Sequence, residues 1–255
     1  MQDMMTQIAS TKPNTDALLG LPYKALQAVP VQECGEAMVA VNKLYPKIAC
    51  VAQNHEATAF TAGDMMLRSG VAERLNLVNE ALQRERPDAS IKLVYAYRHP
   101  SIQQRYFEEI SRGIRLKNPG LDEEAIKDRT HALIAVPEVA GHPTGGAVDV
   151  TIVERGAEID MGTPIWSLDL PTPVPTFAPG VTEEQRENRL LLRRLMAEQG
   201  FAPFDGEWWH FSHGDREWAA LTGEPCAKYQ QIDIQYPASD LGQAKLPPRE
   251  DFIAQ

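Results

Sequence analysis

The stretch GHPTGGAVDV, residues 141–150, decides how the centre of this chain is interpreted. It starts with a histidine in a turn rich in glycine and proline, and it continues into a valine run that one aspartate interrupts. Alternation predicts a strand over residues 145–153, with the valines on one face and Asp149 on the other. A buried carboxylate without a partner is costly, and a metal ion would offset that cost.

His142 precedes Asp149 by seven residues, and the Gly145–Gly146 pair between them lets the backbone turn both side chains toward one point. Imidazole and carboxylate groups are the usual nitrogen and oxygen ligands of catalytic zinc, which keeps three protein ligands and one open position. The expected third ligand is His210. On the spacing alone, a structural role for both histidines remains an equal alternative.

His210 belongs to a second stretch, EWWHF, in which Glu207 stands three residues earlier. Residues three apart on a straight strand point to opposite faces, so both reach one site only at a strand end, a bend or a bulge. With that geometry, His210 binds the metal and Glu207 acts as the general base on a metal-activated water.

Regular elements are expected on both sides of these motifs. Apolar residues at helical spacing predict a helix over residues 69–84, and β-branched and aromatic residues predict a strand over 91–98. A further helix should start at Pro100 with a Ser101–Gln104 capping box, and another over 182–199 with a Thr182–Gln185 box. GEWWHFS, residues 206–212, should form a strand, and residues 156–181 a long proline-rich surface loop.

These elements predict an α+β fold with a small, mainly antiparallel sheet flanked by helices. Residues 1–60 are expected to form an N-terminal arm packed on the main domain, residues 61–225 the main domain with the candidate zinc site, and residues 226–255 a C-terminal tail. Length alone permits one large domain or two small ones.

Composition narrows the functional classes. The 255 residues carry a formal net charge of −10, which argues against nucleic-acid binding and against attraction to anionic membranes. No secretory signal or membrane span is recognisable, and three widely spaced cysteines read as free thiols in a reducing compartment. A cytoplasmic location is therefore expected, whereas the oligomeric state stays undetermined.

The two stretches together resemble the family of zinc D-alanyl-D-alanine dipeptidases, which includes the vancomycin-resistance dipeptidases and belongs with the LAS-type peptidases and the Hedgehog-like fold. The family pattern has a histidine, a glycine three residues on, an aspartate seven residues on, and a later E-x-W-H. Those positions are His142, Gly145, Asp149, and residues 207–210 here. Family-like pieces YRHP, DMGTP and NRLLLRRLMAEQGF extend the similarity over roughly residues 65–220.

The resemblance implies a role for each matching residue. His142, Asp149 and His210 would hold one zinc ion per chain, and Glu207 would activate the water and pass its proton to the leaving amine. Arg98 matches the family arginine that stabilises the developing oxyanion, a role that suits a permanently charged guanidinium. His99 and His213 match no family ligand and are expected to be structural.

Two positions depart from the family pattern. Ala140 stands where the family often has a serine near the substrate carboxylate, and Trp166 stands where it often has an aspartate that pairs with the free amino terminus of the dipeptide. Asp169, three residues further on, is a candidate substitute. These departures bear on the exact substrate and leave the expected catalytic residues in place.

The implied activity is hydrolysis of the D-Ala-D-Ala dipeptide to two D-alanines. A D,D-carboxypeptidase or endopeptidase acting on peptidoglycan peptides with the same machinery is the nearest alternative. A non-catalytic zinc-binding domain is the alternative from another class, and the presence of both Glu207 and Arg98 argues against it, since metal binding alone needs neither.

Overall fold

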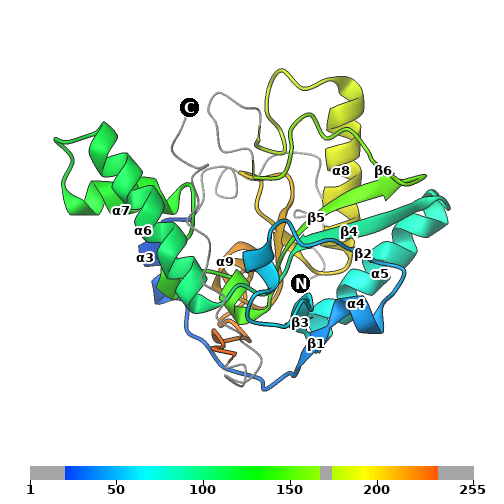
Figure 1. Ribbon diagram of the computed structural model, residues 1–255, viewed down its shortest axis with the longest axis horizontal. Coiled ribbons are helices and arrows are strands. Elements are labelled where there is room, and N and C mark those ends of the chain that lie inside the picture. The colour runs from blue at the N-terminus through cyan, green and yellow to red at the C-terminus, as the bar shows by residue number, and fades with distance from the viewer. Residues whose placement is uncertain (1–20, 167–173, 235–255) are drawn as a thin grey trace.

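The computed structural model of the chain describes residues 21–166 and 174–234 (Figure 1). Its centre is a six-stranded sheet with the order β2-β4-β5-β8-β7 and with β6 paired to β5. The strands are β2 Ala49–Cys50, β4 Ala89–Tyr95, β5 Ala147–Glu154, β6 Ala157–Glu158, β7 Ala202–Pro203 and β8 His210–Ser212. Since β2 and β4 run parallel and the other pairs run antiparallel, the predicted α+β fold with a mainly antiparallel sheet is confirmed.

The remaining elements surround this sheet. Strands β1 Met38–Ala40 and β3 Met66–Arg68 form a separate antiparallel pair. The helices are α3 Tyr23–Ala28, α4 Val41–Leu44, α5 Ser69–Glu85, α6 Pro100–Lys117, α7 Glu123–His131, α8 Glu183–Glu198 and α9 Arg216–Thr222. Short 3-10 turns are η1 His55–Thr58, η2 Pro137–Val139 and η3 His142–Thr144. No helix in the described ranges is long and apolar enough to cross a membrane.

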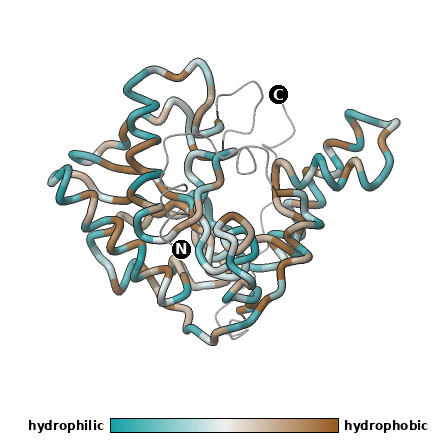
Figure 2. The backbone as a smooth tube through the Cα atoms, turned by 180° about the vertical axis from the view of Figure 1, so that it is seen from behind, coloured by the Kyte–Doolittle hydropathy of each residue, from teal (hydrophilic) through white to brown (hydrophobic). Residues whose placement is uncertain are grey.

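One face of the sheet carries the main hydrophobic core. Helices α5 and α8 pack against each other and contribute Leu75 and Leu195 to the cluster that also contains Val148 and Val150 of β5. Figure 1 shows α6 and α7 on the other side of the molecule from these helices, and Figure 2 shows, from behind, brown apolar segments in the body of the molecule that holds the sheet. Because side chains alternate along β5, the valines face the core and Asp149 faces the opposite side.

Helix α5 and helix α8 agree with the predicted ranges, and the Thr182–Gln185 capping box is present in both directions. The box expected at Ser101 and Gln104 is wrong. The side chain of His99 caps α6 instead, because its Nδ1 accepts the backbone N–H of Ser101 at 3.1 Å. Gln104 reaches Glu108 along the same helix.

The strand expected over residues 206–212 is shorter than predicted. Residues 205–209 form turns, and only His210–Ser212 pair with β5 and β7. A buried ion pair fixes these turns, since Arg193 of α8 contacts Asp205 through Nε and Nη2 at 2.7 and 3.0 Å. The turn places Glu207 beside the sheet rather than within it, which is the bend that the E-x-x-H spacing requires.

Residues before position 61 and residues after position 225 contact each other, and the latter also contact the chain between them. Gln32 and Cys34 donate backbone hydrogen bonds to carbonyls of residues 227 and 228. Ile232 accepts a hydrogen bond from the hydroxyl of Tyr97 at 2.6 Å, and Asp233 contacts the ring of His99. Asp169 and the centre of the predicted proline-rich loop lie outside the described residues.

His213 has the structural role expected for it and provides a stability test. It is 4% exposed, and its Nδ1 contacts the carbonyl of Gly200 at 2.8 Å. Burial lowers its pKa to about 4, so the unfolded chain takes up this proton at a higher pH than the folded protein does.

Stability contributed by neutral His213 is therefore present above about pH 6.5 and is lost as the pH falls toward 4. The free energy of unfolding, measured with urea, should fall between pH 7.5 and pH 5 in both proteins. We expect this fall to be about 2 kcal/mol larger in the wild type than in His213→Gln. The same pH dependence in both proteins would contradict this assignment.

Candidate active site

Three side chains from separate parts of the chain meet on the sheet face opposite α5 and α8. His142 comes from η3, Asp149 from the middle of β5, and His210 from the first residue of β8. The pairing of β5 with β8 sets Asp149 directly across from His210. The structure thus brings together the three residues that the sequence singled out as metal ligands.

The glycine pair after His142 makes this meeting sterically feasible. Gly145 has φ +73°, and a Cβ there would lie 2.7 Å from Met38. A Cβ on Gly146 would lie 2.5 Å from the carbonyl oxygen of His213. The Met38 side chain could move aside, so Gly145 is favoured by its positive φ, whereas Gly146 is required because the backbone oxygen of His213 cannot make room for a Cβ.

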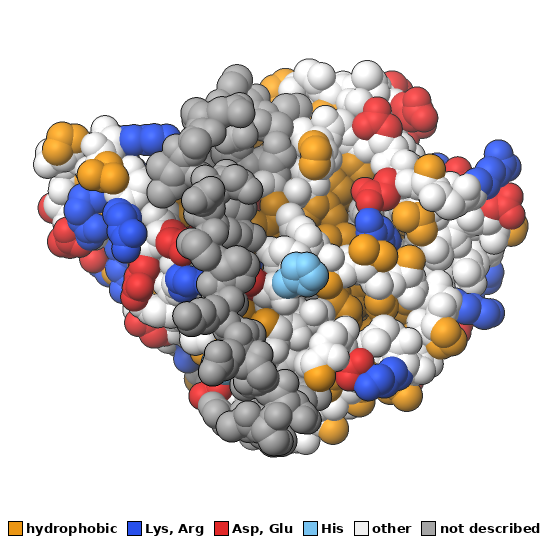
Figure 3. Space-filling view, in the orientation of Figure 1, with side chains coloured by type: hydrophobic (Ala, Val, Ile, Leu, Met, Phe, Trp, Pro, Cys, Tyr) orange, Lys and Arg blue, Asp and Glu red, His pale blue; other side chains and the backbone are white. Residues whose placement is uncertain are grey.

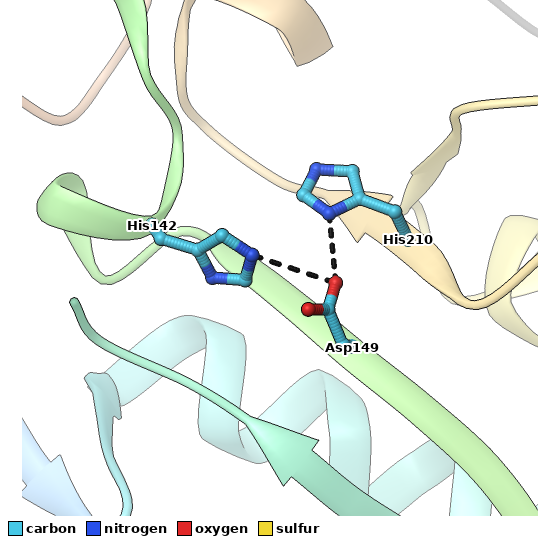
Figure 4. A group of neighbouring side chains, drawn as sticks. All are labelled: His142, Asp149 and His210. Carbon is cyan, nitrogen blue, oxygen red and sulfur yellow. Dashed lines mark hydrogen bonds and ion pairs between the residues drawn. The ribbon is translucent and has the colours of Figure 1, made fainter. Parts of the chain in front are cut away.

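The three side chains point toward one another (Figure 4). Asp149 Oδ1 lies 2.8 Å from His210 Nδ1 and 3.4 Å from His142 Nε2. One ligand atom from each residue falls within 4.8 Å of the others. His142 and Asp149 are buried, and His210 is 14% exposed at its side chain. Two imidazoles and one carboxylate at this separation form a suitable donor set for a divalent cation.

Hydrogen bonds fix the orientation of both histidines. His142 Nδ1 lies 2.8 Å from the carbonyl oxygen of Ala96, an acceptor, so Nδ1 carries the proton and Nε2 is free to coordinate. Nε2 of His210 lies 3.5 Å from Glu217, which also accepts a hydrogen bond from Ser212. The sequence analysis did not identify Glu217, because no motif distinguishes it from the other glutamates.

Burial and neighbouring charges shift the pKa values of these three side chains in different directions. Burial lowers the pKa of His142, which keeps its imidazole neutral. Burial alone would raise the pKa of Asp149, but the neighbouring charge and hydrogen bonds of His142 and His210 hold it well below its ordinary value. The pKa of His210 rises despite burial, because Asp149 and Glu217 both bind its protonated ring. Asp149 is therefore a carboxylate at neutral pH.

Burial and the charges of His210 and Asp149 also act on Glu207, whose pKa shifts upward. Burial raises its pKa to about 7, and the nearby charge of Asp149 adds to this rise, whereas His210 opposes it. A carboxyl group that exchanges its proton near neutral pH suits general acid–base chemistry.

Arg98 lies three residues beyond the end of β4 and is 4% exposed. Its backbone N–H donates to the carbonyl of His142 at 3.3 Å, which ties it to the same turn. Its Nη1 donates to Gln103 Oε1 at 2.8 Å, and Gln103 in turn donates to the carbonyl of Ala135. Gln103, which orients the guanidinium group, belongs to no motif and was not predicted from the sequence.

A cavity of about 350 Å³ opens over these residues. Its lining includes the candidate metal ligands and the residues around them, namely Arg98, Gln103, His142, Asp149, Trp166, Glu207, Trp209, His210 and Glu217. The lining also includes Leu21, Leu26 of α3, and Asp128 and His131 of α7. Figure 3 shows hydrophobic side chains gathered in the middle of one face, with charged side chains of both signs mostly toward its edges.

A buried group of two imidazoles and a carboxylate, next to a glutamate that titrates near neutrality, is the arrangement used by metal-dependent hydrolases. Comparison with known proteins refines this class. The pattern of the peptidase M15 family, described as D-ala-D-ala dipeptidase, matches residues 117–232. A D-alanyl-D-alanine dipeptidase from Synechocystis sp. is 31% identical over 240 residues, which cover 83% of this chain and 95% of the relative. The chain belongs to the D-alanyl-D-alanine dipeptidase family of peptidases.

A solved structure is also similar. It is a mutant of the vancomycin resistance D,D-pentapeptidase VanY, from a VanB-type resistance cassette, in complex with Zn(II). The match has a TM-score of 0.38 and 16% sequence identity, and it covers 65% of this chain and 83% of that chain.

Proposed function

We propose that this protein is a zinc-dependent dipeptidase that hydrolyses D-Ala-D-Ala to two D-alanines. One observation carries the proposal: a single cavity holds the His142–Asp149–His210 group, the acid–base candidate Glu207 and the cation Arg98. Metal binding alone needs only the first of these three parts. Membership of the D-alanyl-D-alanine dipeptidase family supports the substrate.

The donor set fits zinc. His142 Nε2 and a ring nitrogen of His210 would supply two nitrogen ligands, and Asp149 Oδ1 would supply one anionic oxygen. His210 is protonated in the metal-free site and would lose a proton as the ion binds. Such three-ligand sites leave a position open for water or substrate. The hydrogen bond from His142 Nδ1 to Ala96 holds the coordinating tautomer before any ion arrives. Zinc bound here supplies Lewis-acid chemistry, lowering the pKa of a water molecule and polarising the scissile carbonyl.

Glu207 moves the protons in this proposal. Its carboxylate takes a proton from the attacking water and gives it to the nitrogen of the leaving D-alanine. Glu207 is half-buried in the cavity, and its partial removal from water keeps its pKa high enough for the return step. A bound divalent cation lowers this pKa, so kcat/KM should fall as the pH is lowered through a midpoint below 7.

Arg98 provides positive charge on the substrate oxygen that becomes an oxyanion. Its bond to Gln103 uses one of the five guanidinium hydrogens, so donors remain on the cavity side. The guanidinium lies over the ring of Tyr95, with 4.4 Å between Cζ and the ring centroid, which restricts its movement. Fixed donors of this kind stabilise a transition state without reorganisation.

Replacing Arg98 with lysine should lower kcat/KM on D-Ala-D-Ala by about 10²–10³, because an ammonium group keeps the charge but loses the planar fork that Gln103 orients. Steady-state kinetics at saturating zinc measures the effect. The exposed Arg112 provides the matched Arg112→Lys control, for which we expect wild-type rates. A fall of less than about threefold in Arg98→Lys would remove Arg98 from the mechanism.

Membership of the family, rather than a measured fit to the cavity, supports a dipeptide as the substrate. Ala140 and Trp166, at the two positions that depart from the family pattern, both line the cavity. Free D-alanine should be released from D-Ala-D-Ala and not from L-Ala-L-Ala or from a pentapeptide ending in D-Ala-D-Ala. Release from the pentapeptide in preference to the dipeptide would instead establish the carboxypeptidase alternative.

We also propose a cytoplasmic enzyme that acts on D-Ala-D-Ala from cell-wall metabolism. Cys34, Cys50 and Cys226 are all free thiols, which supports a reducing compartment. The division into an arm (1–60), a peptidase domain (61–225) and a tail (226–255) stays a prediction.

A further inference from the structure

Trp166 has a backbone conformation that its residue type disfavours. Its φ of +67° lies in the left-handed region, where a bulky side chain without glycine's freedom is rare. Such a conformation is unfavourable and persists only where other contacts hold it. The contacts of the indole ring are therefore expected to hold the backbone of Trp166 in this conformation.

The indole N–H of Trp166 donates to Asp149 Oδ2 at 3.0 Å. The other oxygen, Oδ1, is the one that faces His210 Nδ1 at 2.8 Å and His142 Nε2 at 3.4 Å. The two oxygens of this carboxylate are thus divided between two tasks. Oδ1 faces the imidazoles that form the metal group, and Oδ2 is occupied by the indole.

The face of the same ring contacts the other half of the site. The Trp166 ring stacks on Tyr95, with 5.5 Å between centroids and an interplanar angle of 25°. The guanidinium carbon of Arg98 lies 4.8 Å from the centroid of the Trp166 ring and 4.4 Å from that of Tyr95. Cation–π contacts on both rings hold the guanidinium in place. Trp166 therefore touches both the candidate ligand Asp149 and the candidate oxyanion partner Arg98.

We propose that Trp166 is a positioning residue for the metal centre. Its N–H holds Asp149 as a ligand with one available oxygen, and its ring holds Arg98 over the cavity. Partners that hydrogen-bond a metal ligand typically change metal affinity by 10–100-fold when they are removed. This role of Trp166 rests on the proposed zinc site. Trp166 lies outside the E-x-x-H and H-x6-D motifs, so the motifs do not predict it.

Trp166→Phe tests the hydrogen bond, because phenylalanine keeps an aromatic ring beside Arg98 but has no N–H. The matched control is Trp218→Phe, which removes an indole bond of similar length, 3.1 Å, to the carbonyl of Gly200. Zinc affinity of the purified proteins is measured by competition with a chromophoric chelator. We expect affinity to fall about 10-fold or more in Trp166→Phe and to change less than about twofold in Trp218→Phe.

Trp166→Ala removes both the hydrogen bond to Asp149 and the ring contact with Arg98. It also provides a second test of zinc affinity if Trp166→Phe folds poorly. It should lose as much zinc affinity as Trp166→Phe, and at saturating zinc it should have a lower kcat, because Arg98 loses its ring contact. Wild-type zinc affinity in both Trp166 variants would overturn the proposal. Zinc binding by the wild type without D-alanine release would refute the proposed function alone, since the affinities would still test Trp166.

Discussion

Glu207→Gln should lower kcat on D-Ala-D-Ala by about 10³, with zinc affinity within a few-fold of the wild type. Glutamine has nearly the same shape as glutamate but cannot accept the proton of the attacking water. Glu207 also lies outside the group of three ligand atoms, so metal binding does not depend on it. Single-turnover kinetics with zinc-loaded protein, together with a measured metal content, checks both parts of this prediction.

The exposed Glu158 supplies the matched control. It pairs with Lys92 on the surface of the sheet, and Glu158→Gln should keep wild-type activity. The fall of kcat/KM at low pH should be present in the wild type and absent from the residual activity of Glu207→Gln. Full activity in Glu207→Gln would show that another group accepts the proton.

His142→Ala should abolish stoichiometric zinc binding at micromolar metal and reduce activity to the background rate. The variant removes one of three ligands and leaves Asp149 with His210 alone, and two protein ligands rarely hold zinc tightly. Isothermal titration with zinc measures the loss directly. His55→Ala removes an exposed histidine in η1, and we expect it to bind zinc like the wild type.

Loss of the imidazole also removes the contact with the carbonyl of Ala96, so a folding defect must be separated from a metal defect. Thermal unfolding without metal gives that separation. A His142→Ala protein that unfolds near the wild-type temperature yet binds one zinc per chain would show that the metal group uses other ligands.

Local periodicity was enough to predict the long elements of the fold. Helices α5 and α8 and strand β5 carry apolar residues at regular spacing, since one face of each packs into the same core. The parallel pairing of β2 with β4 could not be predicted, because β2 is two residues long and its partner lies about forty residues away. His99 as a helix cap was also missed, since histidine is not among the residues usually preferred there.

The candidate site was predictable where a motif carried it. The structure brings His142, Asp149 and His210 together because β5 and β8 are neighbours, and the turn at 205–209 places Glu207 in the same cavity. The roles of these residues stay a prediction. The contacts that orient these residues come from Trp166, Gln103 and Glu217, which are distant in sequence or follow no pattern. Such residues become visible only when the packed structure shows which atoms they reach.

Zinc titration of metal-free protein, with release of free D-alanine from D-Ala-D-Ala as the readout, tests the central claim most directly. The account predicts no activity without metal, a rise in proportion to added zinc, and a plateau at one zinc per chain. Glu207→Gln at the same zinc content should stay near the background rate. Activity in the metal-free protein, or no D-alanine release with one zinc bound, would contradict the assignment of this chain as a zinc-dependent D-Ala-D-Ala dipeptidase.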